Sequence, residues 1–185
     1  MFEALKQACE TCERCDLHRG RTRCVFGYGA KDAKIVFVGE GPGQKEDESG
    51  MPFVGRSGQL LDTYLNRVGL SRETNVYIAN IVKCRPPENR DPKPDERAAC
   101  MPYLKKQLAI LKPNLVVCLG RIAAQELISA DFKVTKEHGV WFEKDGIEWM
   151  GTYHPAALLR NPNDKPAAFE DFVSLREKAQ GYGIL

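Results

Sequence analysis

The cysteines are the first residues in this chain whose type and spacing suggest chemistry. Cys9, Cys12 and Cys15 follow one another at intervals of three in CETCERC, near the N-terminus. This spacing matches the start of a ferredoxin-type iron–sulfur run, C-x2-C-x2-C-x3-C-P, but Arg19 stands where that run needs its fourth cysteine. A four-thiolate site would therefore have to recruit its other ligands from distant parts of the chain.

The four remaining cysteines differ as candidates for distant ligands. Cys84 follows a predicted strand and precedes a proline-rich loop, and Cys100 comes one loop later. Cys118 lies inside an apolar run and Cys24 has no ligand-like context, so we interpret both as ordinary small side chains. Spacing alone leaves open whether Cys9 is a ligand or a bystander, and whether all the thiols are merely structural.

The glycine-rich turn VGEGPGQKED resembles a phosphate-binding loop but lacks its necessary parts. Gln44 occupies the position of the third glycine in G-x-G-x-x-G, and no Lys-Ser or Lys-Thr pair of a P-loop follows. Glu40 would also face a pyrophosphate with negative charge. The turn is instead predicted to bring backbone amides close to another ligand, beside an acidic cluster of Glu40, Glu46, Asp47 and Glu48.

Short apolar runs predict the strands that would position these residues. The runs are AKIVFVG (33–39), NVYIANI (75–81), LVVCLG (115–120) and IEWMGTY (147–153). Helical patterns lie between and after them, with a helix ending near Gly69, one over 94–111 that Pro102 should kink, and one over 165–179.

Strands that alternate with helices predict a three-layer α/β/α fold around a mostly parallel, four-stranded sheet. Ligands of such sheets bind beyond the carboxyl ends of the strands. The Gly-rich turn after the first strand, Asn80 at the end of the second and His154 after the fourth all fall there. We therefore expect one site at that edge of the sheet.

Composition narrows the class of protein. The 185 residues suit a single domain over 1–185, with 43% apolar and 28% charged residues. The N-terminus has no apolar signal core, which predicts a cytoplasmic protein with reduced thiols. A net charge of +2 is too small to indicate a nucleic-acid partner by itself, so any DNA-binding surface should be a local patch.

Four ordered motifs together resemble the family 4 uracil-DNA glycosylases, the iron–sulfur branch of the uracil-DNA glycosylase superfamily. They are CERCDLHRGRTR, GEGPGQKEDESGMPFVGRSGQLL, YIANIVKCRPPENRDP and HPAALLRNP, and they span nearly the whole chain. The resemblance implies a uracil-DNA glycosylase-like fold and a monomer that hydrolyses the N-glycosidic bond of uracil in single- or double-stranded DNA. It also implies a [4Fe-4S] cluster that ties the N-terminal helix to the 84–100 loop, on Cys12, Cys15, Cys84 and Cys100.

The same resemblance places uracil between the Gly-rich turn, Phe53, Asn80 and His154. The turn contributes Glu40, Gly41 and Pro42. An Asn80 amide is complementary to uracil O4 and N3–H and not to cytosine, and Phe53 would stack on the base.

Catalysis is expected from His154, Glu46 and Asn80. His154 would donate to uracil O2, where negative charge collects as the bond breaks. Glu46 is the first choice for polarising the water, with Glu40 nearer the base.

A base inside a duplex must be flipped out to reach such a site. Leu158 is predicted to wedge into the vacated stack, and Arg160 to hold a phosphate beside it. Further phosphate contacts are expected from the local basic patch, Arg19, Arg21, Arg23, Lys83, Arg85 and Arg90. His18 and His138 are expected to be surface residues.

Two alternatives are non-catalytic. An iron–sulfur electron carrier would have no use for Asn80 and His154. A tight uracil-DNA binder would carry an Arg-rich insertion with a covalent histidine, and the segment RPPENRDPKPDE after Cys84 contains neither.

Overall fold

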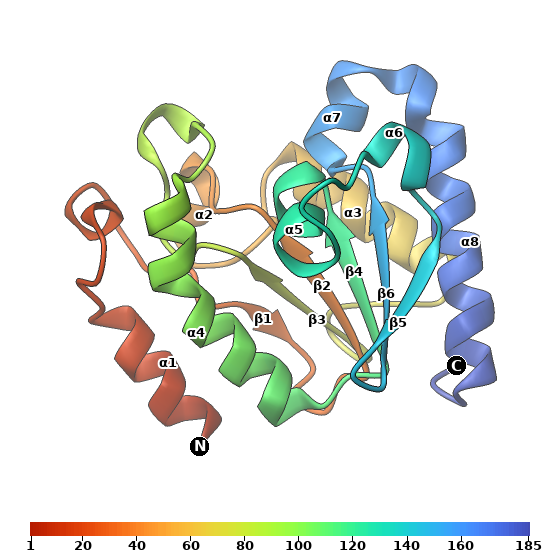
Figure 1. Cartoon of the computed structure of the whole chain (residues 1–185), viewed down its shortest axis with the longest axis horizontal. Coiled ribbons are helices and arrows are strands. Elements are labelled where there is room, and N and C mark those ends of the chain that lie inside the picture. Colours follow the sequence, from red (N-terminus) through yellow and green to blue (C-terminus); the bar gives the residue numbers. More distant parts are fainter.

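The computed structural model describes residues 1–185 and is built around one six-stranded sheet in the order β1-β3-β2-β4-β6-β5 (Figure 1). The strands are β1 (Tyr28–Gly29), β2 (Ile35–Gly39), β3 (Val76–Asn80), β4 (Leu115–Leu119), β5 (Trp141–Lys144) and β6 (Ile147–Thr152). The four predicted strands form its parallel centre, β3-β2-β4-β6. The predicted number of four is wrong, because antiparallel β1 and β5 extend the two edges.

Both edge strands are short. For β5 the sequence contains a recognisable hairpin turn. It pairs with β6 through a two-residue turn in which Asp145 and Gly146 have φ of 57° and 75°. An Asp-Gly pair with positive φ at both residues is the favoured turn of a tight hairpin. β1 has only two residues and carries no comparable pattern.

Helices cover both faces of the sheet. They are α1 (Phe2–Glu10), α2 (Gln44–Ser49), α3 (Arg56–Arg67), α4 (Pro94–Leu111), α5 (Arg121–Leu127), α6 (Val134–Glu137), α7 (Pro155–Arg160) and α8 (Lys165–Gly181). α1, α4 and α5 pack on one face, and α3, α7 and α8 on the other (Figure 1). This arrangement confirms the three-layer α/β/α prediction. No helix has the length and apolar character needed to span a bilayer.

The sheet is buried on both faces, so alternate residues of each strand enter different cores. Val36 and Val38 of β2 pack with α1 and α4, whereas Ile35 and Phe37 pack with α3 and α8. Cys118 of β4 is fully buried in the first of these cores, as expected for a small apolar side chain. Burial on both sides explains why the four central strands read as continuous apolar runs.

The helix boundaries largely follow the predicted signals. α4 begins at Pro94 and runs unbroken through Pro102 to Leu111. Gly69, two residues after α3, has φ of 79°, the left-handed conformation expected beyond a helix C-terminus. Five segments gather at one end of the sheet (Figure 1): the helices α2, α5, α6 and α7, and the loop that precedes α4. These segments surround the site described next.

Candidate functional site

A cavity of about 740 Å³ lies at the carboxyl ends of the parallel strands. Residues 40–43 follow β2, Asn80 ends β3, Gly120 follows β4, and Tyr153 and His154 follow β6, and all of them line the cavity. The predicted edge of the sheet is thus the place where the candidate side chains meet. The volume is typical of a small-molecule site.

Asn80 presents a buried hydrogen-bond acceptor with no partner. Its side chain is only 2% exposed, and its Oδ1 atom accepts no hydrogen bond from the protein. Two other buried polar atoms lack hydrogen bonds, but both lie in ion pairs: Arg97 Nε with Glu126 at 2.6 Å and Glu148 Oε2 with Lys178 at 2.5 Å. An unpaired buried acceptor costs roughly 1–3 kcal/mol, so Asn80 is prepared for a donor that enters the cavity.

His154 is held as a neutral donor. Its Nδ1 atom accepts a hydrogen bond of 3.1 Å from the backbone N–H of Ala156, at the start of α7. The ring proton must therefore be on Nε2. Burial, reinforced by Arg160, lowers the pKa of His154 to about 4. Gly120 makes room for this ring: its φ is +90°, and a side-chain Cβ there would lie 2.9 Å from His154 Cβ.

Phe53 lies beside His154 in a strained conformation. The two ring centroids are 5.5 Å apart with planes inclined at 31°, and Phe53 has φ of 52°, unusual for an aromatic residue. Two glycines allow this placement. A Cβ on Gly39 would lie 2.6 Å from the Phe53 ring and 2.5 Å from Asn80 Oδ1, and one on Gly58 would lie 1.9 Å from the Phe53 carbonyl oxygen.

Arg72 braces the same turn, and sequence analysis did not identify it. Its guanidinium donates to the carbonyl oxygens of Pro52 at 2.7 Å and Phe53 at 2.9 Å, and to Asp62 Oδ1 at 2.9 Å. Backbone strain persists where surrounding contacts over-determine it, and this fork supplies two such contacts. A single arginine in a loop between α3 and β3 gives no sequence signal for that role.

The two predicted carboxylates both line the cavity but have different surroundings. Glu46, on α2, is buried, and its Oε1 accepts from the backbone N–H groups of Val54 and Gly55 at 3.3 and 3.4 Å. Glu40 is partly buried, and burial, with a smaller contribution from Asp91, raises its pKa to about 7. Glu46 therefore also holds the turn after Phe53, whereas Glu40 can change protonation state near neutral pH.

Gly41 and Pro42 complete the wall formed by the Gly-rich turn, as expected. The neighbouring Asp47 belongs to the scaffold and not to the cavity, because its Oδ1 accepts from the backbone N–H of Thr22 at 2.8 Å. Glu48 is exposed and bonded to Gln44 on the same helix. The acidic cluster is thus divided, and two of its four carboxylates face the site.

The predicted DNA-contacting residues divide into exposed and buried ones. Arg160 is exposed at the rim of the cavity, and Arg85 is partly exposed and bonded to Asn89 at 2.8 Å. Leu158 is only 2% exposed and packs in the core with α3 and α8, so the wedge prediction is wrong for this structure. Lys83 is 1% exposed, with its ammonium bonded to Gln107 at 2.6 Å, so the prediction that it contacts DNA is also wrong.

Two arginines of the predicted basic patch are tied to protein groups. Arg21 donates to the carbonyl oxygens of Cys12 and Glu10 at 2.6 and 3.1 Å, and Arg90 forms a bidentate pair with Glu96 at 2.7 and 3.0 Å. The Glu96 carboxylate near the start of α4 and the main-chain carbonyls of Glu10 and Cys12 therefore compete with phosphate for these two arginines. Burial and pairing of this kind cannot be read from the number of basic residues in a segment.

A second unpredicted network supports the strand end that carries His154. Buried Asp171 accepts a hydrogen bond from Thr152 Oγ1, the last residue of β6, and lies 2.9 Å from His138 Nδ1. His138 also lies against the Tyr153 ring. The surface role expected for His138 is therefore wrong, since it connects α8 to the backbone beside the cavity.

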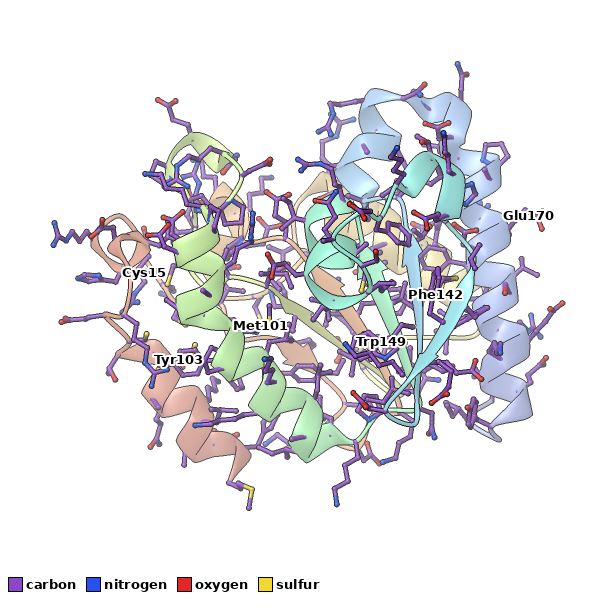
Figure 2. The ribbon with its side chains drawn as sticks, in the orientation of Figure 1. Cys15, Met101, Tyr103, Phe142, Trp149 and Glu170 are labelled. Atoms are coloured by element: carbon purple, nitrogen blue, oxygen red, sulfur yellow. The ribbon has the colours of Figure 1, made fainter.

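The cysteines surround a second cavity, between α1 and α4 and far smaller than the first. It is lined by Cys9, Cys12, Cys15, Cys84 and Cys100, with Arg14, Arg21, His18, Lys83, Ala99 and Tyr103. Figure 2 shows Cys15 in the loop after α1 and Tyr103 on α4, and the Tyr103 hydroxyl donates to the Ala8 carbonyl of α1 at 3.3 Å. The four thiols expected as ligands thus come from three segments of the chain and line one cavity. His18, expected at the surface, is partly buried at this wall.

The surroundings of these sulfurs suit thiolate ligands. Arg21 donates to Cys84 Sγ at 3.4 Å, and the Lys83 backbone N–H donates to Cys100 Sγ at 3.3 Å. Hydrogen bonds to sulfur and nearby cations stabilise metal-bound thiolates. No group of three or more Cys, His, Asp or Glu side chains is close enough to hold one metal ion.

The fold and the larger cavity together define a class of protein. A parallel α/β sheet brings an unpaired amide, an aromatic ring and a neutral N–H donor to one edge, where a flat ring with adjacent donor and acceptor atoms would fit. Nucleobases are rings of this type. The fold is α/β, and the shape and polar groups of the cavity are compatible with a nucleobase.

Comparison with known proteins specifies the family. Residues 26–175 match the family model described as the uracil DNA glycosylase superfamily. The chain is 44% identical to a type-4 uracil-DNA glycosylase of Sulfurisphaera tokodaii, over 96% of this chain and 84% of that protein. Proteins of the same name from Archaeoglobus fulgidus and Thermotoga maritima are 44% and 43% identical, covering 90% and 89% of this chain and 87% and 86% of theirs. The chain belongs to the type-4 branch of the uracil-DNA glycosylase superfamily.

Proposed function

We propose that this protein is a uracil-DNA glycosylase that removes uracil from DNA by hydrolysis and leaves an abasic site for repair. Its type-4 relatives carry that name at 42–44% identity. The observation that carries the proposal is the buried, unpaired Oδ1 of Asn80 in the cavity. Uracil N3–H is a donor that would satisfy it, and the Asn80 NH2 group would donate to O4.

This pairing explains discrimination against cytosine. Cytosine presents an acceptor at N3 and a donor at N4, so both of its groups would meet a like group of Asn80. Two unpaired buried groups cost roughly 1–3 kcal/mol each. Asn80 is buried at the end of β3, so solvent would not compensate for these losses.

Bond cleavage requires stabilisation of the leaving base. The bond between sugar C1′ and uracil N1 breaks with its electron pair moving to the base, where negative charge spreads to O2 and O4. The Nε2–H of His154 would donate to O2, and the group needs no positive charge for this role. Phe53 would stack on the base and hold it in the plane of these donors.

Water must then add to the electron-deficient sugar and lose a proton. Glu40 is the better candidate to accept that proton. Its pKa is about 7, and no protein group donates a hydrogen bond to its carboxylate. Glu46, which accepts from two backbone amides, would orient the turn and the water beside it. This changes the order of preference expected from sequence alone.

The target base must leave the helix to enter the cavity, at a cost of a few kcal/mol. Arg160 at the rim is placed to contact a phosphate beside the flipped nucleotide. Leu159, partly exposed next to buried Leu158, is the apolar side chain of α7 that can approach the stack.

The cluster is the second part of the proposal. Cys12, Cys15, Cys84 and Cys100 would hold a [4Fe-4S] cluster, which would connect the segment after α1 to the loop and helix that follow β3. Hydrolysis transfers no electrons, so the cluster would supply a structural tie. The donors from Arg21 and Lys83 to sulfur support this assignment.

A glycosylase assay tests the activity. We would use a labelled oligonucleotide with one uracil, unpaired or opposite G or A, with cytosine and thymine strands as controls, followed by alkaline cleavage of abasic sites. We expect cleavage at uracil alone, abolished by Asn80→Ala and unaffected by Asn66→Ala on the exposed face of α3. Absence of cleavage by iron-loaded protein would overturn the proposal and favour a binding or electron-transfer protein.

A further inference from the structure

Two cysteines outside the expected ligand set form a pair of their own. Cys9 Sγ and Cys24 Sγ are 3.1 Å apart, although the residues are fifteen positions apart in the chain. Cys9 is 1% exposed on α1, and Cys24 is partly exposed in the segment before β1. Neither thiol lines the base-binding cavity or belongs to the four expected cluster ligands, although Cys9 lines the cysteine cavity.

Contacts of the neighbouring residues hold the two thiols near each other. Arg21 ties the segment that leads to Cys24 back to α1 through the Glu10 carbonyl at 3.1 Å. The Val25 N–H donates to the Lys83 carbonyl at 2.7 Å, which anchors the residue after Cys24 to the loop beyond β3. Cys9 packs in the core that α1 shares with α4. The pair is therefore positioned by contacts on both sides.

We propose that Cys9 and Cys24 are a modification site, a dithiol that a two-electron oxidant converts reversibly into a disulfide. The two S–H bonds break and one S–S bond forms, releasing two electrons and two protons. With diamide as oxidant, its N=N bond accepts both and becomes a hydrazine. The sulfurs need to move about 1 Å closer to reach the bond length of about 2.05 Å.

The disulfide would have a defined structural consequence. It would join α1 to the segment before β1 and enclose Cys12 and Cys15, two of the four proposed cluster ligands, in one covalent loop. Closing such a loop limits the unfolded chain. The N-terminal segment would then remain attached to the domain whether or not a cluster is bound.

Disulfide mapping is the test. Iron-loaded protein is treated with a small excess of diamide, free thiols are alkylated under denaturing conditions, and tryptic peptides are identified by mass. We expect a peptide of residues 7–14 joined to residues 24–31, which dithiothreitol separates. Residues 7–14 also contain Cys12, so fragmentation of the joined peptide and the Cys9→Ser variant assign the bond.

Cys24 also contacts Cys84, which provides the competing outcome. A Cys24–Cys84 bond, a Cys12–Cys15 bond, or seven alkylated thiols in treated wild-type protein would overturn the proposal. Cys118→Ser serves as the matched control, because Cys118 is buried in β4 away from the pair and should leave the joined peptide unchanged.

Thermal unfolding tests whether the disulfide stabilises the attachment of the N-terminal segment. We compare the thermal unfolding midpoints of wild-type and Cys9→Ser protein, first under reducing conditions and then after diamide treatment. Treatment should widen the difference between the two midpoints by roughly 5–10 °C in favour of wild type. An equal difference in both conditions would show that the bond does not stabilise the N-terminal segment and would contradict its role as a tie.

Discussion

The base-binding cavity and the cysteine cavity are built in different ways. Asn80 ends β3, and Glu40, Gly120 and His154 lie within two residues of the ends of β2, β4 and β6. Sheet hydrogen bonds therefore set their relative positions. The expected cluster ligands come from a loop after α1, a loop after β3 and helix α4, which no sheet hydrogen bonds connect.

This contrast indicates which of the two cavities would need a bound cofactor to hold its residues in place. The first cavity keeps its geometry through the sheet and through braces such as Arg72 and Asp171. The second is assembled from two loops and helix α4 without sheet pairing, so a group that bridges the sulfurs would add connections the chain itself does not make. Changes in the two regions should accordingly affect catalysis and cofactor content separately.

The largest expected effect is on catalysis, in the first cavity. His154→Ala removes the Nε2–H donor and should lower the single-turnover rate about 10²–10³-fold, as for one preorganised donor. Iron content should not change. His154→Gln, which retains an N–H donor, should lose less. Equal rates for wild type and His154→Ala, or loss of iron in the variant, would break the proposed separation of the two regions.

The converse experiment concerns the second cavity. Cys84→Ser should lose most bound iron and the associated visible absorption, whereas Cys118→Ser should retain both, because Cys118 lies in the sheet core. Structural metal sites contribute several kcal/mol to folding, so the thermal midpoint should also fall. Iron assay, absorption spectroscopy and thermal unfolding measure this directly. Full iron retention by Cys84→Ser would remove Cys84 from the ligand set.

A smaller effect is expected from the brace behind Phe53. Arg72→Met leaves the buried carbonyl oxygens of Pro52 and Phe53 without donors and should cost roughly 2–4 kcal/mol of unfolding free energy. Arg67→Met is the matched control, with the same change of charge at an exposed position on α3, and should stay within about 0.5 kcal/mol of wild type. Urea unfolding measures both variants. Equal losses of unfolding free energy would show that the loss of a positive charge, and not of the hydrogen bonds to Pro52 and Phe53, causes the destabilisation.

The sequence predicted the central architecture because strong local patterns coincide there. Four apolar runs defined the parallel strands, and their carboxyl ends located Asn80 and His154. The contacts that support the site were not predictable in the same way. Arg72 and Asp171 act through partners more than ten residues away, and no local pattern encodes such pairs.

The two errors about DNA-contacting residues arose from side-chain exposure and not from the identity of the elements that carry them. Leu158 and Lys83 lie on segments that face the site, but each side chain turns into the core. A six-residue helix such as α7 shows less than two turns of periodicity, too little to decide which leucine is buried. For Lys83, a buried ammonium beside Gln107 is contrary to the usual exposure of lysine.

The smallest expected effect is a pH dependence that separates Glu40 from His154. Glu40 has a pKa of about 7, so at pH 6 only about one tenth of it is ionised, and a rate that needs its carboxylate should be about tenfold below the plateau above pH 8. His154, with a pKa of about 4, stays neutral throughout this range. Glu40→Gln should give a lower, flat profile, and Glu48→Gln, at an exposed position of α2, should keep the wild-type profile.

Stability should respond in the opposite direction. The folded protein holds the Glu40 proton up to about pH 7, whereas the unfolded chain releases it near its ordinary pKa of 4.5, so folding binds protons between these values. This contribution is fully present below pH 4.5 and is lost as pH rises through 7. Glu40→Gln should therefore gain stability over wild type as pH rises from 5 to 8, measured by urea unfolding. A constant stability difference together with a flat wild-type rate profile would assign water activation to Glu46 or to solvent.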